Sequence, residues 1–340
     1  MPPTPEITEH VLTTPTHTTR YLAAGPQDGP PLVFVHGWPA QASTWRHQLT
    51  HFAALGHRAI APDLRGYGGS TVHTVPEAYA QEHVVGDMLA LLDHLGHRAA
   101  VWVGHDWGSA TVWNIASHHP DRCVAVANLC VPYRTLEHGL PTLVSLVDRH
   151  RYPAAEYPTG QFDYFTQHVD HPDTVAAVFD AEPANTVRAL YRRGNPAGRD
   201  AVFRTATVTR DGGWFGGAPS APDVPLDPAV LTEDDLAELT ESLARNGFTG
   251  PDSYYRNDAA NAAYAALAGN GGYLDLPVLF VEATYDYVCD TATSDLALPM
   301  RQYCRDLTER SVDAGHWVAQ ERPEEVNAAL AQWLTERVPG

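Results

Sequence analysis

The chain has 340 residues, with 22 Lys or Arg against 41 Asp or Glu, so its formal charge is −19. This acidity argues against nucleic acid and against an anionic membrane surface as partners, because phosphate binding needs clustered cations. Residues 1–14 lack the basic start and apolar run of a secretory signal, and no window approaches the roughly 18 apolar residues that span a bilayer. The four cysteines show neither CxxC spacing nor the density of a disulfide scaffold. We therefore expect reduced thiols in a cytoplasmic protein.

Apolar runs typical of buried strands alternate with helical patterns in the first part of the chain. The runs lie at 31–36, 58–63, 99–103 and 124–130. Helical spacing of apolar residues predicts helices over 43–55 and 79–95 and a third from about residue 107. Strands alternating with helices predict an α/β fold with a mainly parallel sheet, covered by helices on both faces.

The pattern changes at Pro132. Residues 132–273 hold helical stretches separated by Pro- and Gly-rich loops, and one helix has Thr232 as a good N-cap, with Asp235 as its capping-box partner. Strand patterns return at 277–281 and 309–312, and a final helix is predicted over 323–337. We therefore expect one α/β core domain, formed by 1–131 and 274–340, with 132–273 inserted as a helical cap.

The strongest local signal is Gly104-His-Asp-Trp-Gly108, which follows a buried strand and opens a helix. A nucleophile elbow needs this context, because small glycines permit the tight turn that raises the central side chain above the sheet edge. The start of the helix also favours a carboxylate or a developing oxyanion there. A GxDxG match alone is weak, but its place between strand and helix makes Asp106 the predicted nucleophile.

An acid and a histidine follow in the chain order of an α/β-hydrolase triad. Asp286 lies a few residues beyond the strand at 277–281, and His316 follows the next strand and a glycine. Asp290 and Glu282 lie close enough to compete with Asp286 for the role of the acid, and Asp290 is the next choice. The triad predicted is Asp106, Asp286 and His316.

A second signal is His36-Gly-Trp-Pro39, directly after the first buried strand. In this fold, that loop and the residue after the nucleophile each supply one backbone N–H of an oxyanion hole. We therefore assign the backbone N–H groups of Trp38 and Trp107 to the oxyanion hole. The side chains of His36 and His105 are interpreted as structural.

An aspartate nucleophile decides the class of reaction. A carboxylate with a pKa near 4 is ionised at neutral pH and can displace a leaving group from a saturated carbon. The resulting alkyl ester has a carbonyl that activated water can attack, so the substrate is an epoxide or an alkyl halide. An opening epoxide needs a proton donor, and tyrosine hydroxyls can supply one. The inserted segment offers tyrosines in Phe162-Asp-Tyr164 and in Tyr254-Tyr-Arg-Asn257.

Together, these motifs resemble those of the epoxide hydrolases of the α/β-hydrolase fold, and the soluble type more closely than the microsomal type. The resemblance covers nearly the whole chain from about Thr19, and it rests on His36–Pro39, Asp63-Leu-Arg-Gly-Tyr-Gly68, Gly104–Gly108, Phe162–Tyr164, Gly247-Phe-Thr-Gly-Pro251, Tyr255-Arg-Asn257 and Gly315-His-Trp317. It implies that Tyr164 and Tyr255 hold the epoxide oxygen, that no metal or cofactor takes part, and that the product is a vicinal diol. Adjacency to these motifs makes Trp38, Trp107, Phe162 and Trp317 candidate walls of the substrate pocket.

Two other functions remain open. The elbow also resembles that of haloalkane dehalogenases, but those carry Asn where this chain has Trp38, and fluoroacetate-type dehalogenases carry Arg where it has Trp107. A non-catalytic ligand-binding protein on the same fold is the second alternative. The acid loop, Glu282–Asp286, lacks the Gly often found there in epoxide hydrolases. The sequence predicts a small-molecule epoxide as partner, but neither its identity nor the oligomeric state.

Overall fold

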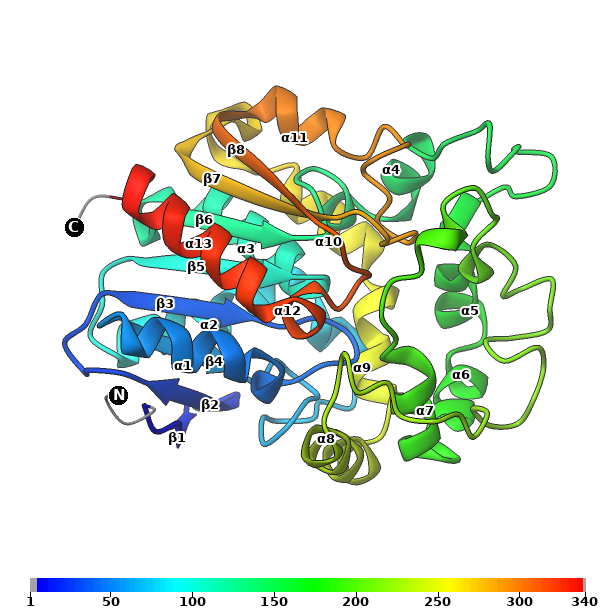
Figure 1. Ribbon diagram of the computed structural model, residues 1–340, viewed down its shortest axis with the longest axis horizontal. Helices are drawn as coiled ribbons and strands as arrows, with labels where there is room; N and C mark the ends of the chain where they lie inside the picture. Colours follow the sequence, from blue (N-terminus) through cyan, green and yellow to red (C-terminus); the bar gives the residue numbers. More distant parts are fainter. Residues whose placement is uncertain (1–4, 339–340) are drawn as a thin grey trace.

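A twisted eight-stranded sheet forms the centre of the computed structural model, which describes residues 5–338 (Figure 1). The order of the strands is β1-β2-β4-β3-β5-β6-β7-β8. The pairs β1–β2 and β2–β4 are antiparallel, and every later pair is parallel. This confirms the mainly parallel sheet that the sequence predicts. The strands are β1 (Thr8–Thr13), β2 (Thr18–Ala24), β3 (Pro31–Val35), β4 (Arg58–Pro62), β5 (Ala100–His105), β6 (Cys123–Leu129), β7 (Leu274–Ala283) and β8 (Cys304–Val312).

The hairpin of β1 and β2 and the first half of β8 have no counterpart among the predicted strands. Side chains of β1 are exposed or half-buried, and most residues of β8 are polar and are also exposed or half-buried. Of these strands, β1 and β8 lie at the edges of the sheet, where strands bury little apolar surface, so they lack the continuous apolar runs that mark the central strands.

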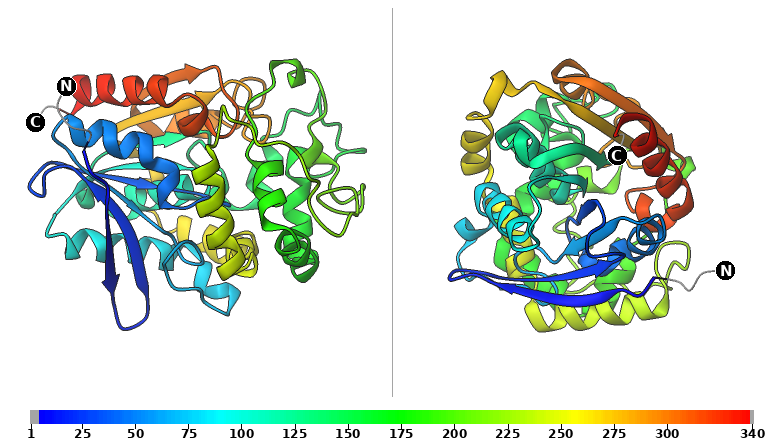
Figure 2. Two further views of the ribbon diagram at one scale, coloured as in Figure 1. Left: turned by 60° about the horizontal axis from the view of Figure 1, so that its bottom comes forward. Right: turned by 90° about the vertical axis from the view of Figure 1, so that its left-hand side faces the viewer.

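Helices cover both faces of the sheet, as Figures 1 and 2 show. Along β5, the side chain of Trp102 packs in one apolar cluster with α2 and α3, whereas Val101 and Val103 pack in the other with α1 and α13. This alternation follows from the period of two in a strand. Burial on both faces explains why the central strands read as continuous apolar runs. The helices of this part are α1 (Arg46–Ala54), α2 (Gln81–His94), α3 (Trp107–His118), α11 (Leu298–Tyr303), α12 (Val318–Glu321) and α13 (Pro323–Arg337).

The chain between β6 and β7 builds a helical layer beyond the carboxyl ends of the parallel strands, at the right of Figure 1. We call residues 132–273 the cap. Its α8 begins with the capping box that the sequence predicts: the Thr232 hydroxyl accepts from the Asp235 backbone N–H, and the Asp235 carboxylate accepts from the Thr232 backbone N–H. The cap helices are α4 (Leu140–Ser145), α5 (Asp163–Asp170), α6 (Pro172–Asp180), α7 (Pro183–Leu190), α8 (Glu233–Asn246), α9 (Thr249–Asp252) and α10 (Asp258–Ala265).

Residues 1–4 and 339–340, the outer ends of the predicted core domain, lie outside the described residues. Across 5–338, none of the helices combines the length and the apolar character needed to cross a bilayer.

Candidate active site

Asp106 lies in the sharp turn between β5 and α3. Its backbone has φ 53° and ψ −124°, a conformation that costs energy in a residue other than glycine and that the surrounding packing must hold. The two glycines of the motif permit this packing. A Cβ atom on Gly108 would lie 2.1 Å from the Val35 carbonyl oxygen, and one on Gly104 would lie 2.3 Å from Asn128 Oδ1. The turn therefore has the close packing of a nucleophile elbow.

Two backbone N–H groups act on the Asp106 carboxylate. The N–H of Trp38, after β3, donates to Oδ1 at 2.6 Å, and the backbone N–H of Trp107, at the start of α3, helps to lower the pKa of the same carboxylate. These are the donors that the sequence suggests for an oxyanion hole. Both N–H groups can therefore hydrogen-bond an oxygen of the Asp106 side chain, whether that side chain is a free carboxylate or has reacted.

His316 lies between two carboxylates. Its Nδ1 donates to Asp286 Oδ2 at 2.7 Å, and its Nε2 is 3.7 Å from Asp106 Oδ2. Asp286 also accepts from the backbone N–H groups of Val288 and Cys289, each at 3.1 Å. The structure thus brings Asp106, Asp286 and His316 together at the carboxyl ends of β5 and β7 and in the loop after β8.

The two competing acids contact other groups. Asp290 Oδ2 is 2.7 Å from Nη1 of Arg151, and its Oδ1 accepts from the backbone N–H groups of the turn that follows it. Glu282 accepts from the hydroxyls of Thr291 and Ser311. Of the three acids that the sequence leaves open, Asp286 is the one that contacts the imidazole.

The electrostatics of the site favour a charged His316. Burial opposes the charge, but the attraction and hydrogen bond of Asp286, together with the charge of Asp106, outweigh it and raise the pKa of His316 to about 9. Burial raises the pKa of Asp106, against the opposing effects of His316 and the two backbone N–H groups. For Asp286, burial acts in the same direction, but His316 outweighs it and lowers the pKa.

Two cap tyrosines lie in the same cavity as Asp106. Tyr164 belongs to α5, and Tyr255 to the 3-10 turn that follows α9. Their ring centroids are 5.7 Å apart and the rings are nearly perpendicular. Burial raises the pKa of both hydroxyls well above its ordinary value, so both stay protonated and can donate. The neighbouring Tyr254 instead donates to the Arg65 carbonyl at 3.2 Å.

The cavity has a volume of about 360 Å³ and extends from Asp106 outward between the cap and the core. This size suits a small molecule. Trp38 and Trp317 line it, as the sequence suggests, whereas Trp107 and Phe162 line a second, smaller cavity that also borders Asp106 and Tyr164. Apolar walls that the sequence does not indicate come from Leu190, Val202, Phe203, Trp214 and Val288.

The family model described as the alpha/beta hydrolase fold matches residues 30–323. Epoxide hydrolase A of Mycobacterium tuberculosis is 34% identical over 96% of this chain and 97% of its own length. Bifunctional epoxide hydrolase 2 of Sus scrofa is 30% identical over 98% of this chain, but only 57% of its own length is covered. The crystal structure of epoxide hydrolase A from Mycobacterium thermoresistibile has a TM-score of 0.79 and 32% identity, and covers 97% of this chain and 98% of its own.

The chain belongs to the epoxide hydrolases of the α/β-hydrolase fold.

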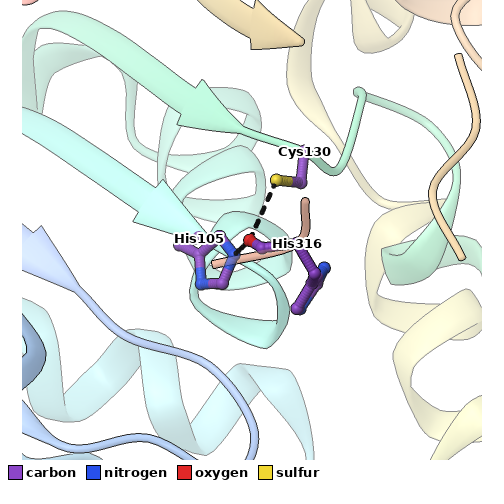
Figure 3. A group of neighbouring side chains, drawn as sticks. All are labelled: His105, Cys130 and His316. Atoms are coloured by element: carbon purple, nitrogen blue, oxygen red, sulfur yellow. Dashed lines mark hydrogen bonds between the residues drawn. The ribbon is translucent and has the colours of Figure 1, made fainter. Parts of the chain in front are cut away.

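In this member of the epoxide hydrolase family, two buried residues beside the triad fix the backbone of His316 (Figure 3). Nε2 of His105 donates to the His316 carbonyl oxygen at 2.7 Å, and Sγ of Cys130 donates to the same oxygen at 3.4 Å. A carbonyl can only accept, so the neutral His105 ring carries its proton on Nε2. The structural role predicted for the His105 side chain fits this contact, but nothing local in the sequence indicates Cys130.

The same side chains form two groups with metal-ligand atoms within 4.8 Å of one another: His105, Cys130 and His316, and Asp286, Cys289 and His316. Burial raises the pKa of both thiols well above its ordinary value, so they stay protonated. In the structure, His105 and Cys130 hydrogen-bond the His316 carbonyl oxygen, and Asp286 accepts from His316 Nδ1, so these groups have partners within the protein.

A cluster of side chains with polar atoms packs against the ring of Tyr255. The ring of His168 stacks on that of Tyr255, with centroids 4.2 Å apart, and His168 Nε2 accepts from the indole N–H of Trp214 at 3.2 Å. Asp252 accepts from the indole N–H of Trp38 at 3.0 Å, and its Oδ1 is 3.4 Å from His168 Nδ1. These residues come from three cap segments and the loop after β3, so the sequence gives no sign of their grouping.

Proposed function

We propose that the protein converts an epoxide and water to a vicinal diol, and that Asp106 attacks a ring carbon to form an alkyl ester. The observation that supports this proposal is that the Asp106 carboxylate and the side chains of Tyr164 and Tyr255 line one cavity. As the ring opens, the hydroxyls of Tyr164 and Tyr255 would hydrogen-bond the oxygen and protonate the developing alkoxide. The cap would thus supply the acid, and the core the nucleophile.

The second step would hydrolyse the ester. The backbone N–H groups of Trp38 and Trp107, which lie at the Asp106 carboxylate, would stabilise the oxyanion that forms when water attacks the ester carbonyl. Nε2 of His316 faces Asp106, so it is the base that would activate this water. Asp286 would orient the imidazole and stabilise its protonated form. We further propose that the reaction needs no metal or cofactor and that it takes place in the cytoplasm.

Alkylation should change the basicity of His316, which gives a prediction on pH dependence. The charge of Asp106 contributes to the pKa of about 9, and esterification removes that charge. In the alkyl-enzyme, the pKa of His316 should therefore fall below 9, so that more of the imidazole is neutral and can act as a base. We expect the rate constant of ester hydrolysis to decline as the pH falls through this lower pKa, because the imidazole of His316 becomes protonated and can no longer accept a proton from water.

Single-turnover kinetics across pH would measure this, with the decay of the alkyl-enzyme followed by intact mass. An apparent pKa of 9 or higher for hydrolysis would contradict the contribution of the Asp106 charge.

Product analysis with a panel of aryl and aliphatic epoxides tests the proposed function. We expect diol, detected by chiral chromatography, from at least one class of epoxide, and no halide release from chloro- and bromoalkanes. Halide release without diol formation would instead indicate a haloalkane dehalogenase. Tight binding of epoxides without diol formation would indicate a non-catalytic ligand-binding protein.

A further inference from the structure

A buried acid and a buried histidine lie behind Trp38 and Tyr255, within a cluster of aromatic rings. His168 belongs to α5 and Asp252 to α9, and their exposed fractions are 0% and 1%. Neither side chain lines the two cavities that border Asp106. Burying polar side chains among aromatic rings costs free energy that packing alone does not return. The position of this pair, beside two groups of the active site, therefore points to a role in the reaction.

Asp252 holds the side chain of Trp38. Its Oδ1 accepts from the indole N–H of Trp38 at 3.0 Å, whereas its Oδ2 is buried and has no hydrogen-bond partner among residues 5–338. The backbone N–H of the same tryptophan donates to Oδ1 of Asp106 at 2.6 Å. The buried carboxylate thus fixes, through the indole, the residue that supplies an N–H to the nucleophile.

His168 holds the ring of Tyr255. The two ring centroids are 4.2 Å apart and the planes differ by 25°, so the imidazole covers one face of the phenol. The four other rings that pack against Tyr255 meet it nearly edge-on, at 78° to 88°. A ring stacked on one face limits the tilt of the phenol. The direction of the Tyr255 hydroxyl therefore depends on the position of His168.

The imidazole is itself oriented by polar contacts. The indole N–H of Trp214 can only donate, so Nε2 of His168 is the acceptor and the proton of the ring lies on Nδ1. That Nδ1 is 3.4 Å from Oδ1 of Asp252, the oxygen that also accepts from Trp38. One carboxylate oxygen thus connects the side chain of Trp38 with the ring that stacks on Tyr255.

We propose that Asp252 and His168 are positioning residues that align hydrogen-bond donors on two sides of Asp106. His168 acts on ring opening through Tyr255. Asp252 acts on ester hydrolysis through Trp38, and on ring opening through its contact with His168. This inference rests on the proposed function, because it assigns each residue to one or both of its steps.

Pre-steady-state kinetics at saturating epoxide tests the assignment, with the alkyl-enzyme followed by rapid quenching and intact mass. In His168→Ala, we expect the rate constant of alkylation to fall by about 10- to 100-fold, the order of effect that a misplaced catalytic group has, and that of hydrolysis to stay unchanged. In Asp252→Leu, both rate constants should fall. Both are first-order rate constants, so a loss of folded protein changes the amplitude of the adduct signal and not these values.

Conservative variants separate positioning from packing. Asp252→Asn keeps an oxygen that can accept from the indole of Trp38, so it should restore most of the rate constant of hydrolysis. His168→Phe keeps a flat ring that can stack on Tyr255, so alkylation should be slowed less than in His168→Ala.

Asp258→Leu is the matched control for Asp252→Leu. Like Asp252, Asp258 is a cap carboxylate with one oxygen that accepts from an N–H group, here the backbone of Leu140 at 2.8 Å, and a second, buried oxygen without a partner among the described residues. It lines neither of the two cavities that border Asp106. Its replacement should lower stability and leave both rate constants unchanged.

The outcomes also separate the two proposals. Unchanged rate constants in His168→Ala and Asp252→Leu, or an equal fall of both steps in His168→Ala, would overturn the positioning roles and leave the proposed function standing. If the unmodified protein forms neither alkyl-enzyme nor diol with any epoxide, both proposals are rejected.

Discussion

Replacing His316 with glutamine should stop turnover and leave the protein covalently alkylated. Attack by the Asp106 carboxylate needs no base, whereas hydrolysis of the ester needs the imidazole to accept a proton from water. Loss of a general base slows a reaction by about 10²–10⁴-fold. Ester hydrolysis should therefore fall by that factor, while the alkylation step continues.

Intact mass spectrometry measures the adduct. An epoxide adds as a whole molecule, because its leaving oxygen stays attached, so the mass should rise by that of one substrate. An alkyl halide would add only its alkyl group. His316→Gln combined with Asp106→Asn is the control and should give no adduct. Absence of an adduct with an epoxide that the unmodified protein converts would reject the ester intermediate.

Removing both cap hydroxyls should greatly slow ring opening. In the double variant Tyr164→Phe with Tyr255→Phe, the cavity keeps its aromatic walls but has no acid beside the epoxide oxygen. We expect alkylation to slow by about 10²–10⁴-fold, the factor that general acid catalysis contributes. Each single variant should lose less, because the other hydroxyl remains in the cavity.

The rate of adduct formation in the His316→Gln background isolates this step. Tyr254→Phe is the matched control, because this buried neighbour bonds to the Arg65 carbonyl, and its loss should cost about 1 kcal/mol of stability without affecting alkylation. Full activity in the double variant would exclude the tyrosines from ring opening.

The central strands and the elbow could be predicted because their signals are local. A strand buried on both faces is a continuous apolar run, and the turn around Asp106 needs glycines at fixed places beside it. The same applies to Asp286 and His316, which follow strand ends in a set order. The choice between Asp286 and Asp290 does not depend on a local signal; in the structure, Asp286 is the one of the two that contacts the imidazole.

Other features depend on the tertiary arrangement. Tyr164 could be singled out only through the resemblance to epoxide hydrolases. Its neighbour Phe162 shows why position in the chain is not enough: Tyr164 borders both cavities, whereas Phe162 lines only the smaller one. Cys130 contacts the backbone carbonyl of His316, and His168 stacks on the ring of Tyr255. Both of these partners are remote in sequence.

A single turnover in ¹⁸O-labelled water, with protein in excess over epoxide, tests most directly whether Asp106 bonds to the substrate. If it does, the oxygen added to the first diol comes from the Asp106 side chain, and water replaces it in the carboxylate. We therefore predict an unlabelled first diol and one ¹⁸O in the peptide that contains Asp106. A labelled first diol with unlabelled Asp106 would show that water attacks the epoxide directly, and would contradict the ester mechanism.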